Sequence, residues 1–235
     1  MVFDMSNIQY HIGVIVPSSN TTMELELCRF LQYGLVFHFA RVPLREVTPE
    51  ALDEMKKDAI KAARLLADLK PVVIGYGCMS VKEDDDLAIA IENEVNIPTI
   101  TVAQAVFDAF KHLNIKKMIY ISPTTEEVDL YERQFIERQG FKITKNKNMN
   151  ILDNREIGEV SPETVKEFAL SIKAEGADGF FISCTNLQAI DIIDTLEKET
   201  NLPVVTANQA FVWGVIKKGK IPIKKIEGLG RLFNI

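Results

Sequence analysis

The chain contains the same pattern of residues twice, and this internal repeat limits the folds available to it. Residues 96–105 read NIPTITVAQA and residues 201–210 read NLPVVTANQA, a shift of 105 residues. A shift of 106 residues relates three further pairs, which are Pro17 with Pro123, Gly34 with Gly140, and Cys78 with Cys184. This period is too long for a solenoid repeat. It predicts two copies of one folding unit related by a pseudo-twofold axis, with a boundary near residue 115.

Apolar segments rich in β-branched residues alternate with amphipathic segments along the chain. The apolar segments predict strands at IGVIV, LVFHFARV, PVVIG and PTITV in the first copy, and at KMIYIS, GFFIS and PVVTA in the second. Thr48-Pro49 and Ser161-Pro162 are typical of helix starts, as is the acidic run at residues 84–86. The alternation predicts an α/β fold with a parallel sheet in each copy.

The composition argues against several classes of function. The chain has 235 residues, 47% of them hydrophobic, and a formal net charge of -6, so it lacks the basic surplus that nucleic-acid binding requires. No apolar run reaches the roughly 20 residues of a membrane span, and the N-terminus lacks the pattern of a signal peptide. We therefore expect a cytoplasmic protein that binds neither nucleic acid nor membranes.

The motifs of common cofactors are missing from the sequence. There is no P-loop, and residues 75–77, Gly-Tyr-Gly, lack the third glycine of a dinucleotide-binding loop. His11, His38 and His112 have no spacing, with each other or with the cysteines, that suits a zinc site or a thiol protease. We expect neither a metal nor a cofactor.

Two cysteines occupy equivalent positions in the two copies. Cys78 and Cys184 each follow a predicted strand, and open α/β sheets bind ligands beyond the carboxyl ends of their strands. The segments that follow, residues 80–83 and 185–188, resemble helix starts, which lower the pKa of a nearby thiol. Two facing cysteines could move a proton at carbon, or add to a double bond and let it rotate. We expect the third cysteine, Cys28, to be a buried packing residue.

The segment PSSNTT at residues 17–22 contains five small hydrogen-bonding residues between a predicted strand and a predicted helix. One or two such residues are enough to cap a helix. Open amides at a helix N-terminus attract carboxylate and phosphate groups. With its counterpart SPTTEE at residues 122–127, the segment predicts a seat for an acidic ligand between the two cysteines.

Five segments together resemble the branch of the aspartate/glutamate racemase superfamily that contains maleate cis–trans isomerases and arylmalonate decarboxylases. They are PSSNTTME at 17–24, GYGCMS at 75–80, LDNREIG at 152–158, ISCTNL at 182–187 and GLGRLF at 228–233. The resemblance covers nearly the whole chain and implies a cofactor-independent enzyme. It implies two similar lobes, each a four-stranded parallel sheet flanked by helices, with the active site in the cleft between them. We expect lobes at residues 1–115 and 116–235, with residues 215–235 packing back on the first, and a homodimer or larger homo-oligomer.

The resemblance also implies roles for individual residues. Cys78 would be the nucleophile that attacks the double bond of a small dicarboxylic acid such as maleate, and Cys184 would be the opposite acid/base. The implied substrate-binding residues are Pro17, Ser18, Asn20, Met79, Ser80, Thr124, Thr125, Asn154, Thr185 and Asn186. The side chains that we expect to set the pocket volume are Leu44, Met79, Val81 and Phe211.

The chain departs from the family pattern at Thr124. The family has a tyrosine at this position, so the identity of the acid stays open, and Tyr76 and Tyr131 are candidates to replace the missing phenol. Decarboxylases have glycine at the first cysteine position, and racemases usually have Cys-Asn-Thr where residues 78–80 read Cys-Met-Ser. Three alternatives to a cis–trans isomerase stay open: a two-base amino-acid racemase, an arylmalonate-type decarboxylase and a non-catalytic acid-binding protein.

Overall fold

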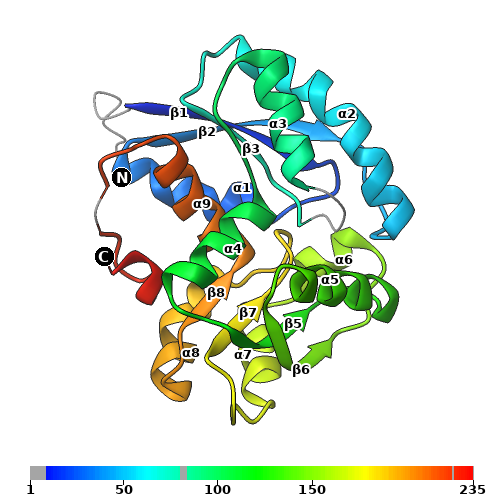
Figure 1. Cartoon of the computed structure of the whole chain (residues 1–235), viewed down its shortest axis with the longest axis vertical. Coiled ribbons are helices and arrows are strands. Elements are labelled where there is room, and N and C mark those ends of the chain that lie inside the picture. Colours follow the sequence, from blue (N-terminus) through cyan, green and yellow to red (C-terminus); the bar gives the residue numbers. More distant parts are fainter. Residues whose placement is uncertain (1–8, 80–83, 224, 235) are drawn as a thin grey trace.

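Two parallel four-stranded sheets with the same strand order form the framework of the protein (Figure 1). The computed structural model describes residues 9–79, 84–223 and 225–234. The first sheet has the order β2-β1-β3-β4, with β1 (Tyr10–Pro17), β2 (Leu35–Val42), β3 (Val73–Tyr76) and β4 (Thr99–Thr101). The second has the order β6-β5-β7-β8, with β5 (Lys117–Ser122), β6 (Lys142–Asn148), β7 (Gly179–Ile182) and β8 (Val204–Thr206). The predicted fold class is confirmed.

Helices connect the strands and cover the sheets. They are α1 (Met23–Cys28), α2 (Pro49–Ala67), α3 (Asp84–Val95), α4 (Val102–His112), α5 (Glu126–Arg138), α6 (Asn154–Glu159), α7 (Pro162–Leu170), α8 (Ile193–Thr200) and α9 (Ala207–Lys218). Short 3₁₀ helices lie at η2 (Arg29–Tyr33), η3 (Ile190–Ile192) and η4 (Arg231–Phe233). The predicted caps Thr48 and Ser161 accept hydrogen bonds from the third residue beyond them, and the acidic run begins α3. None of the described helices is long and apolar enough to cross a membrane.

The repeated NxPxxTxxQA segments form the strand-to-helix junctions β4–α4 and β8–α9. At the first junction Thr101 Oγ1 accepts from Gln104 N (3.2 Å) and Gln104 Oε1 accepts from Thr101 N (3.1 Å). Thr206 and Gln209 make the same reciprocal pair at 3.3 and 3.1 Å. Each repeat is therefore a capping box, which satisfies two backbone amides at the start of a helix.

The two repeat-derived helices pack against each other near the centre of the molecule (Figure 1). Helix α9 also contacts β3, β4 and α1 of the first sheet's layer. Gly214 makes this approach possible, because a Cβ at that position would lie 2.6 Å from the Cβ of Ala105. The α4–α9 pair thus links the two sheets on the side where β4 and β8 lie.

The sequence did not single out strand β6. It pairs with β5 at one edge of the second sheet, and every residue from Lys142 to Asn148 is partly or fully exposed. An edge strand with both faces half exposed has no apolar run, and the usual strand signal depends on such a run.

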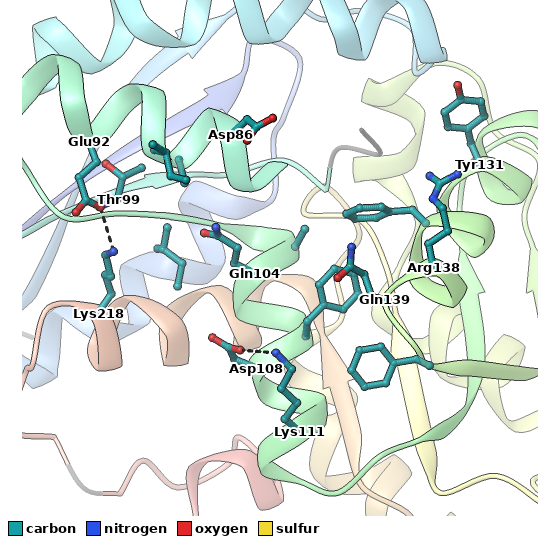
Figure 2. A pocket seen from close by; sticks show the side chains of 17 residues that line it. Asp86, Glu92, Thr99, Gln104, Asp108, Lys111, Tyr131, Arg138, Gln139 and Lys218 are labelled. Atoms are coloured by element: carbon teal, nitrogen blue, oxygen red, sulfur yellow. Dashed lines mark hydrogen bonds and ion pairs between the residues drawn. The ribbon is translucent and has the colours of Figure 1, made fainter. Parts of the chain in front are cut away.

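A wide groove of about 870 Å³ crosses α4 between α3 and α5 (Figure 2). Its apolar lining includes Phe107, and ion pairs join Glu92 to Lys218 at 3.0 Å and Asp108 to Lys111 at 3.3 Å. Neither Cys78 nor Cys184 lines this groove. The groove therefore lies apart from the site that the sequence predicts at the two cysteines.

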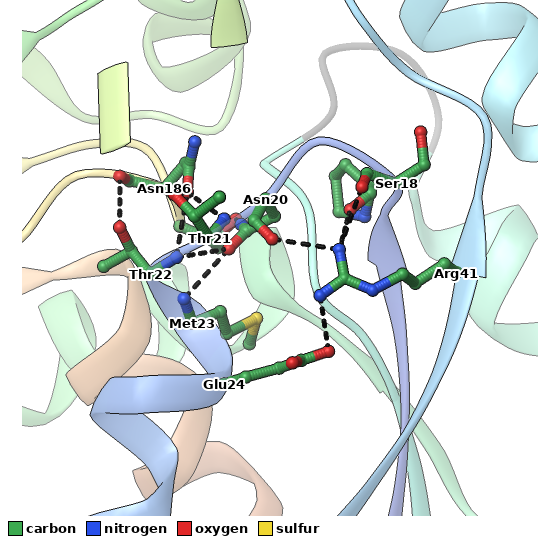
Figure 3. A network of polar contacts seen from close by, with 10 residues as sticks. Ser18, Asn20, Thr21, Thr22, Met23, Glu24, Arg41 and Asn186 are labelled. Atoms are coloured by element: carbon green, nitrogen blue, oxygen red, sulfur yellow. Dashed lines mark hydrogen bonds and ion pairs between the residues drawn. The ribbon is translucent and has the colours of Figure 1, made fainter. Parts of the chain in front are cut away.

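The side chain of Asn186 joins the second lobe to the turn between β1 and α1 (Figure 3). Its Oδ1 accepts hydrogen bonds from the amides of Thr21 (2.7 Å) and Thr22 (3.1 Å). The Thr22 hydroxyl donates to the Asn186 carbonyl (2.8 Å), and Asn186 Nδ2 donates to the carbonyl of Asn154. A side chain from one lobe therefore satisfies two amides of the turn that leads into α1 in the other.

Glu26 forms a second connection between the lobes. Its Oε1 accepts from the amides of Ala189 (3.0 Å) and Ile190 (3.1 Å), and its Oε2 accepts from Asn208 Nδ2 (2.7 Å). Burial raises the pKa of the Glu26 carboxyl, while Asn208 and the two amides oppose the shift.

Replacing Asn186 with alanine should weaken the whole fold. The substitution leaves the Thr21 and Thr22 amides without their acceptor, and a buried group that loses its partner costs about 1–3 kcal/mol. We expect urea denaturation to show a free energy of unfolding lower by about 2 kcal/mol. The control is Gln188→Ala, because that side chain bonds only within the second lobe, to the carbonyl of Gly158. An equal loss in both variants would contradict the assignment.

Candidate active site

A small cavity lies at the carboxyl ends of the central strands of both sheets. The end of β1 and residues that follow β1, β3, β5 and β7 contribute to its wall, together with the β2–α2 segment and parts of α2, α5 and α6. The lining residues are Pro17, Asn20, Leu44, Val47, Leu52, Cys78, Met79, Thr124, Glu132, Asn154, Cys184 and Thr185. The cavity thus lies where parallel sheets bind ligands.

The structure brings the two repeat-related cysteines to the same cavity. Cys78 lies two residues beyond β3, and Cys184 lies two residues beyond β7. None of the three cysteines forms a disulfide. Cys28 is exposed at the end of α1, so the expectation that it is a buried packing residue is wrong.

Cys184 has an unusual backbone conformation. Its φ angle is 84°, in the left-handed region that non-glycine residues rarely adopt. Strained backbone of this kind persists only where neighbouring interactions hold it, and it is concentrated at functional sites. The Asn186 amide donates to Cys184 Sγ at 3.4 Å and is one such interaction.

The thiol of Cys184 is a weak acid. Burial raises its pKa to about 12, the charge of Glu132 acts in the same direction, and the amides of Asn186 and Leu187 oppose the shift. No α-helix starts directly after this cysteine, because the next regular element is the 3₁₀ helix at Ile190–Ile192. The predicted low pKa at a helix N-terminus is therefore wrong for Cys184. Residues 80–83, which carry the corresponding prediction for Cys78, lie outside the described part of the chain.

Amide and hydroxyl groups form most of the polar wall. Asn20 Nδ2 donates to Thr185 Oγ1 (3.1 Å), and that hydroxyl donates to the carbonyl of Gly77 (3.0 Å). Asn154 Nδ2 donates to Ser19 Oγ at 2.8 Å. These bonds fix each side chain and use one of the two hydrogens of each amide group, so the other remains for a ligand.

Three of the predicted site residues do not line the cavity. Ser18 is exposed and bonds with Leu44, accepting from its amide at 3.0 Å and donating to its carbonyl at 3.2 Å. Thr125 is the residue before α5 and makes no side-chain cap. Asn186 joins the lobes, as described above. Ser80 and Val81 lie outside the described residues.

Most of the amides of the PSSNTT turn are already occupied. Asn20 Oδ1 accepts hydrogen bonds from Thr22 N (3.1 Å) and Met23 N (2.9 Å). Asn186 Oδ1 accepts from Thr21 N and Thr22 N, as described above. Arg41 beside the turn donates to the carbonyls of Ser18 and Asn20 and pairs with Glu24 at 2.7 Å (Figure 3). The amides of Thr21, Thr22 and Met23 are therefore not open to an anion, and the predicted seat for an acidic ligand stays a prediction that depends on Asn20 at the cavity wall.

The candidates for the missing tyrosine also lie elsewhere. Tyr76 is fully buried in β3, and Tyr131 lines the groove of Figure 2. Phe211 is buried against Gly75, where an added Cβ would lie 2.2 Å from the phenyl ring. The hydroxyl of Thr124 donates to Ser122 Oγ at 3.4 Å, next to the cavity.

Glu132 is a cavity residue that the sequence reading missed. It lies on the buried face of α5 with Val128, Asp129, Phe135 and Ile136. The sequence did contain a signal for it. Asp129 and Glu132 are three residues apart on the apolar face of an amphipathic helix, and carboxylates are rarely buried without a partner.

The cavity is small and contains no cation among the residues that the structure describes. Its lining includes no Lys, Arg or His, and no described cluster of His, Cys, Asp and Glu could hold a metal. Its volume is about 20 Å³, enough for roughly one water molecule. A four-carbon acid needs more room, so its entry requires the cavity to widen.

Comparison with known proteins gives consistent matches over most of the chain. A maleate isomerase from Geobacillus stearothermophilus is 28% identical over 228 residues, covering 88% of this chain and 91% of the relative. One from Alcaligenes faecalis is also 28% identical over 228 residues, covering 88% and 90%. The crystal structure of a maleate isomerase from Pseudomonas putida S16 with maleate superimposes with a TM-score of 0.90 at 25% identity, covering 95% of this chain and 97% of that one.

The family model described as arylmalonate decarboxylase matches residues 12–233, which include all strands except the first two residues of β1, and every residue that lines the cavity. The predicted resemblance is thereby confirmed. This protein belongs to the arylmalonate decarboxylase family.

Proposed function

We propose that this protein is a cis–trans isomerase of a small dicarboxylic acid, converting maleate or a close analogue to its trans isomer. The observation that carries the proposal is that Cys78 and Cys184, equivalent residues of the repeat, line one small cavity. The similarity to maleate isomerases supports it. In this proposal residues 1–115 and 116–235 form the two lobes, and the acid binds between them.

The reaction begins with addition of the Cys78 thiolate to one carbon of the double bond. A C–S bond forms, and the π electrons move to the neighbouring carbon, where the attached carboxylate delocalises them. The former double bond is now single and rotates. When the C–S bond breaks, the electron pair returns to Cys78 and the trans isomer is released.

Cys184 serves as the acid and base on the other side. It donates its proton to the carbanion carbon and, after rotation, its thiolate removes a proton from the same carbon. A thiol with a pKa of about 12 stays protonated at neutral pH, and its conjugate base is strong enough to take the proton back. The high pKa of Cys184 suits this role better than that of nucleophile.

Neutral donors bind the carboxylates in this proposal. The second amide hydrogens of Asn20 and Asn154 are available at the wall, whereas the hydroxyl hydrogens of Thr124 and Thr185 are already donated to Ser122 Oγ and to the carbonyl of Gly77. Donors fixed in a site without water stabilise the charge that builds up on the carboxylate oxygens during addition.

The isomerase proposal predicts that both cavity cysteines are essential. Proton NMR in D2O should show fumarate forming from maleate, and Cys78→Ala and Cys184→Ala should each lower kcat/KM by at least about 100-fold. Cys28→Ala is the matched control, since Cys28 is exposed and lies outside the cavity, and it should keep wild-type activity. Loss of the α-proton signal from L-aspartate or L-glutamate, without maleate turnover, would favour a racemase instead.

The raised pKa of Cys184 predicts slow alkylation. Only the thiolate reacts with iodoacetamide, so the rate at Cys184 should rise about tenfold per pH unit from pH 8 to 10 without a plateau. Peptide mass spectrometry, which reads each cysteine separately, should find Cys28 modified first because it is exposed. A plateau at Cys184 below pH 9 would show that its pKa is not raised.

A further inference from the structure

Thr185 connects the two segments that carry the cavity cysteines. It lines the cavity and directly follows Cys184. Its hydroxyl donates to the carbonyl of Gly77 at 3.0 Å, and Gly77 is the residue directly before Cys78. The same hydroxyl accepts from Asn20 Nδ2 at 3.1 Å. The position of Thr185 therefore affects how the two cysteine segments lie relative to each other.

Asn208 holds the backbone of Thr185 from helix α9. Its side chain is buried, and its Nδ2 donates one hydrogen to the Thr185 carbonyl at 3.0 Å and the other to Glu26 Oε2 at 2.7 Å. Both hydrogens of this amide group are used, so its two partners determine its orientation. Asn208 Oδ1 has no hydrogen-bond partner among the described residues. An unpaired buried oxygen is unfavourable, and the bridge that Nδ2 makes compensates for it.

Glu26 holds the other side of this bridge. Besides the bond to Asn208, its Oε1 accepts from the amides of Ala189 (3.0 Å) and Ile190 (3.1 Å). The arrangement requires an acceptor at each carboxyl oxygen, and it does not depend on the charge of the group. The loop that begins at Cys184 is thus held near its start by Asn208 and at its end by Glu26.

The bond from Asn208 reaches the thiol through one rigid peptide unit. The Thr185 carbonyl that Asn208 binds and the Asn186 amide belong to the same peptide, which is trans. Because a peptide unit is planar, fixing its carbonyl also fixes the direction of its N–H on the opposite side. That N–H donates to Cys184 Sγ at 3.4 Å. Asn208 therefore orients the amide that contacts the thiol, next to a residue whose φ of 84° needs support.

We propose that Asn208 is a positioning residue that Glu26 holds in place. By orienting the Thr185–Asn186 peptide, it sets the Cys184 thiol against the opposite wall of the cavity. Its effect on catalysis rests on the proposed isomerase reaction, whereas the positioning itself does not.

The repeat indicates that α9 does not need this asparagine for its own helix. Asn208 lies where the first copy has Ala103, and the capping box of α9 is made by Thr206 and Gln209. Asn208→Ala should therefore fold, and it removes only the bridge.

The first test is amide hydrogen exchange of the full-length chain, followed by NMR. In Asn208→Ala the amide of Asn186 should exchange about tenfold faster, because its peptide loses a hydrogen bond that holds it. The Gln209 amide in the capping box of α9 should exchange at the wild-type rate, which shows that the change is local.

Glu197→Gln is the matched control. Glu197 is another buried glutamate that accepts backbone amides, from Val204 at 2.9 Å and Arg231 at 3.0 Å, and it does not line the cavity. This variant should lose stability, yet the Asn186 amide should exchange within about twofold of the wild-type rate, since its own bonds are intact.

Isomerisation kinetics test the link to catalysis. Asn208→Ala should lower kcat about 10- to 100-fold with a smaller change in KM, because a misplaced reacting group slows the chemical step. Asn208→Asp keeps the shape but replaces the donor with an acceptor, so it should be at least as slow at pH 8. Its kcat should recover partly at lower pH, as the new carboxyl group takes up a proton that it can donate. Simple loss of stability would not produce that recovery.

A double-mutant cycle tests whether Glu26 acts through Asn208. Glu26→Gln keeps one acceptor for the amides of Ala189 and Ile190, but its Nε2 would face Asn208 Nδ2. It should lower kcat, and its combination with Asn208→Ala should be no slower than the slower single variant. Additive losses would show that the two residues act independently.

Two results would overturn the inference. Folded Asn208→Ala with wild-type exchange at the Asn186 amide would exclude the positioning role, and faster exchange with unchanged kcat would exclude its role in catalysis. If Asn208→Ala does not fold, as judged by circular dichroism, the same exchange measurement on Glu26→Gln decides. A wild-type protein that leaves maleate unchanged, with faster exchange in Asn208→Ala, would refute the proposed reaction and leave the positioning inference intact.

Discussion

The bonds that Asn186 makes to the amides of Thr21 and Thr22 determine whether this protein has a site at all. These amides belong to the turn that leads into α1, and they have this acceptor only when the second lobe lies against the first. The cost of leaving them unsatisfied therefore opposes separation of the lobes. Cys78 and Cys184 belong to different lobes, so the same bonds also favour the arrangement in which both thiols line one cavity. Glu26 strengthens this coupling one turn later in α1.

Much of the fold could be predicted because the chain repeats its capping signals. Thr101 with Gln104 and Thr206 with Gln209 mark the same strand-to-helix junction in each lobe, and local hydrogen bonding alone is sufficient to form it. Strand β6 could not be found in this way. It forms because the edge of β5 offers unpaired backbone groups, and its own side chains contribute no apolar face. The reason that β6 is a strand therefore lies in the open edge of β5, and the residues of β6 themselves do not indicate it.

Residues of the candidate site could be predicted where their position after a strand end places them at the cavity. Properties of the site that depend on burial could not be predicted. Cys78, Cys184, Asn20 and Asn154 reach the cavity because they follow strand ends or begin a helix there. The amides of the PSSNTT turn looked available for a ligand, but small polar groups satisfy a protein partner as readily as an anion, and spacing does not distinguish the two. The raised pKa of Cys184 depends on what surrounds the thiol, and Glu132 was missed because charged residues on a helix usually face solvent.

The small cavity volume has a kinetic meaning. In the proposed reaction, a space for roughly one water molecule cannot admit a dicarboxylate as it stands, so each cycle would include one opening for entry and another for release. The rate of that opening would then limit the turnover number, however fast the thiols react. While the cavity is narrow, the proposed carbanion would be shielded from bulk water and from unwanted protonation.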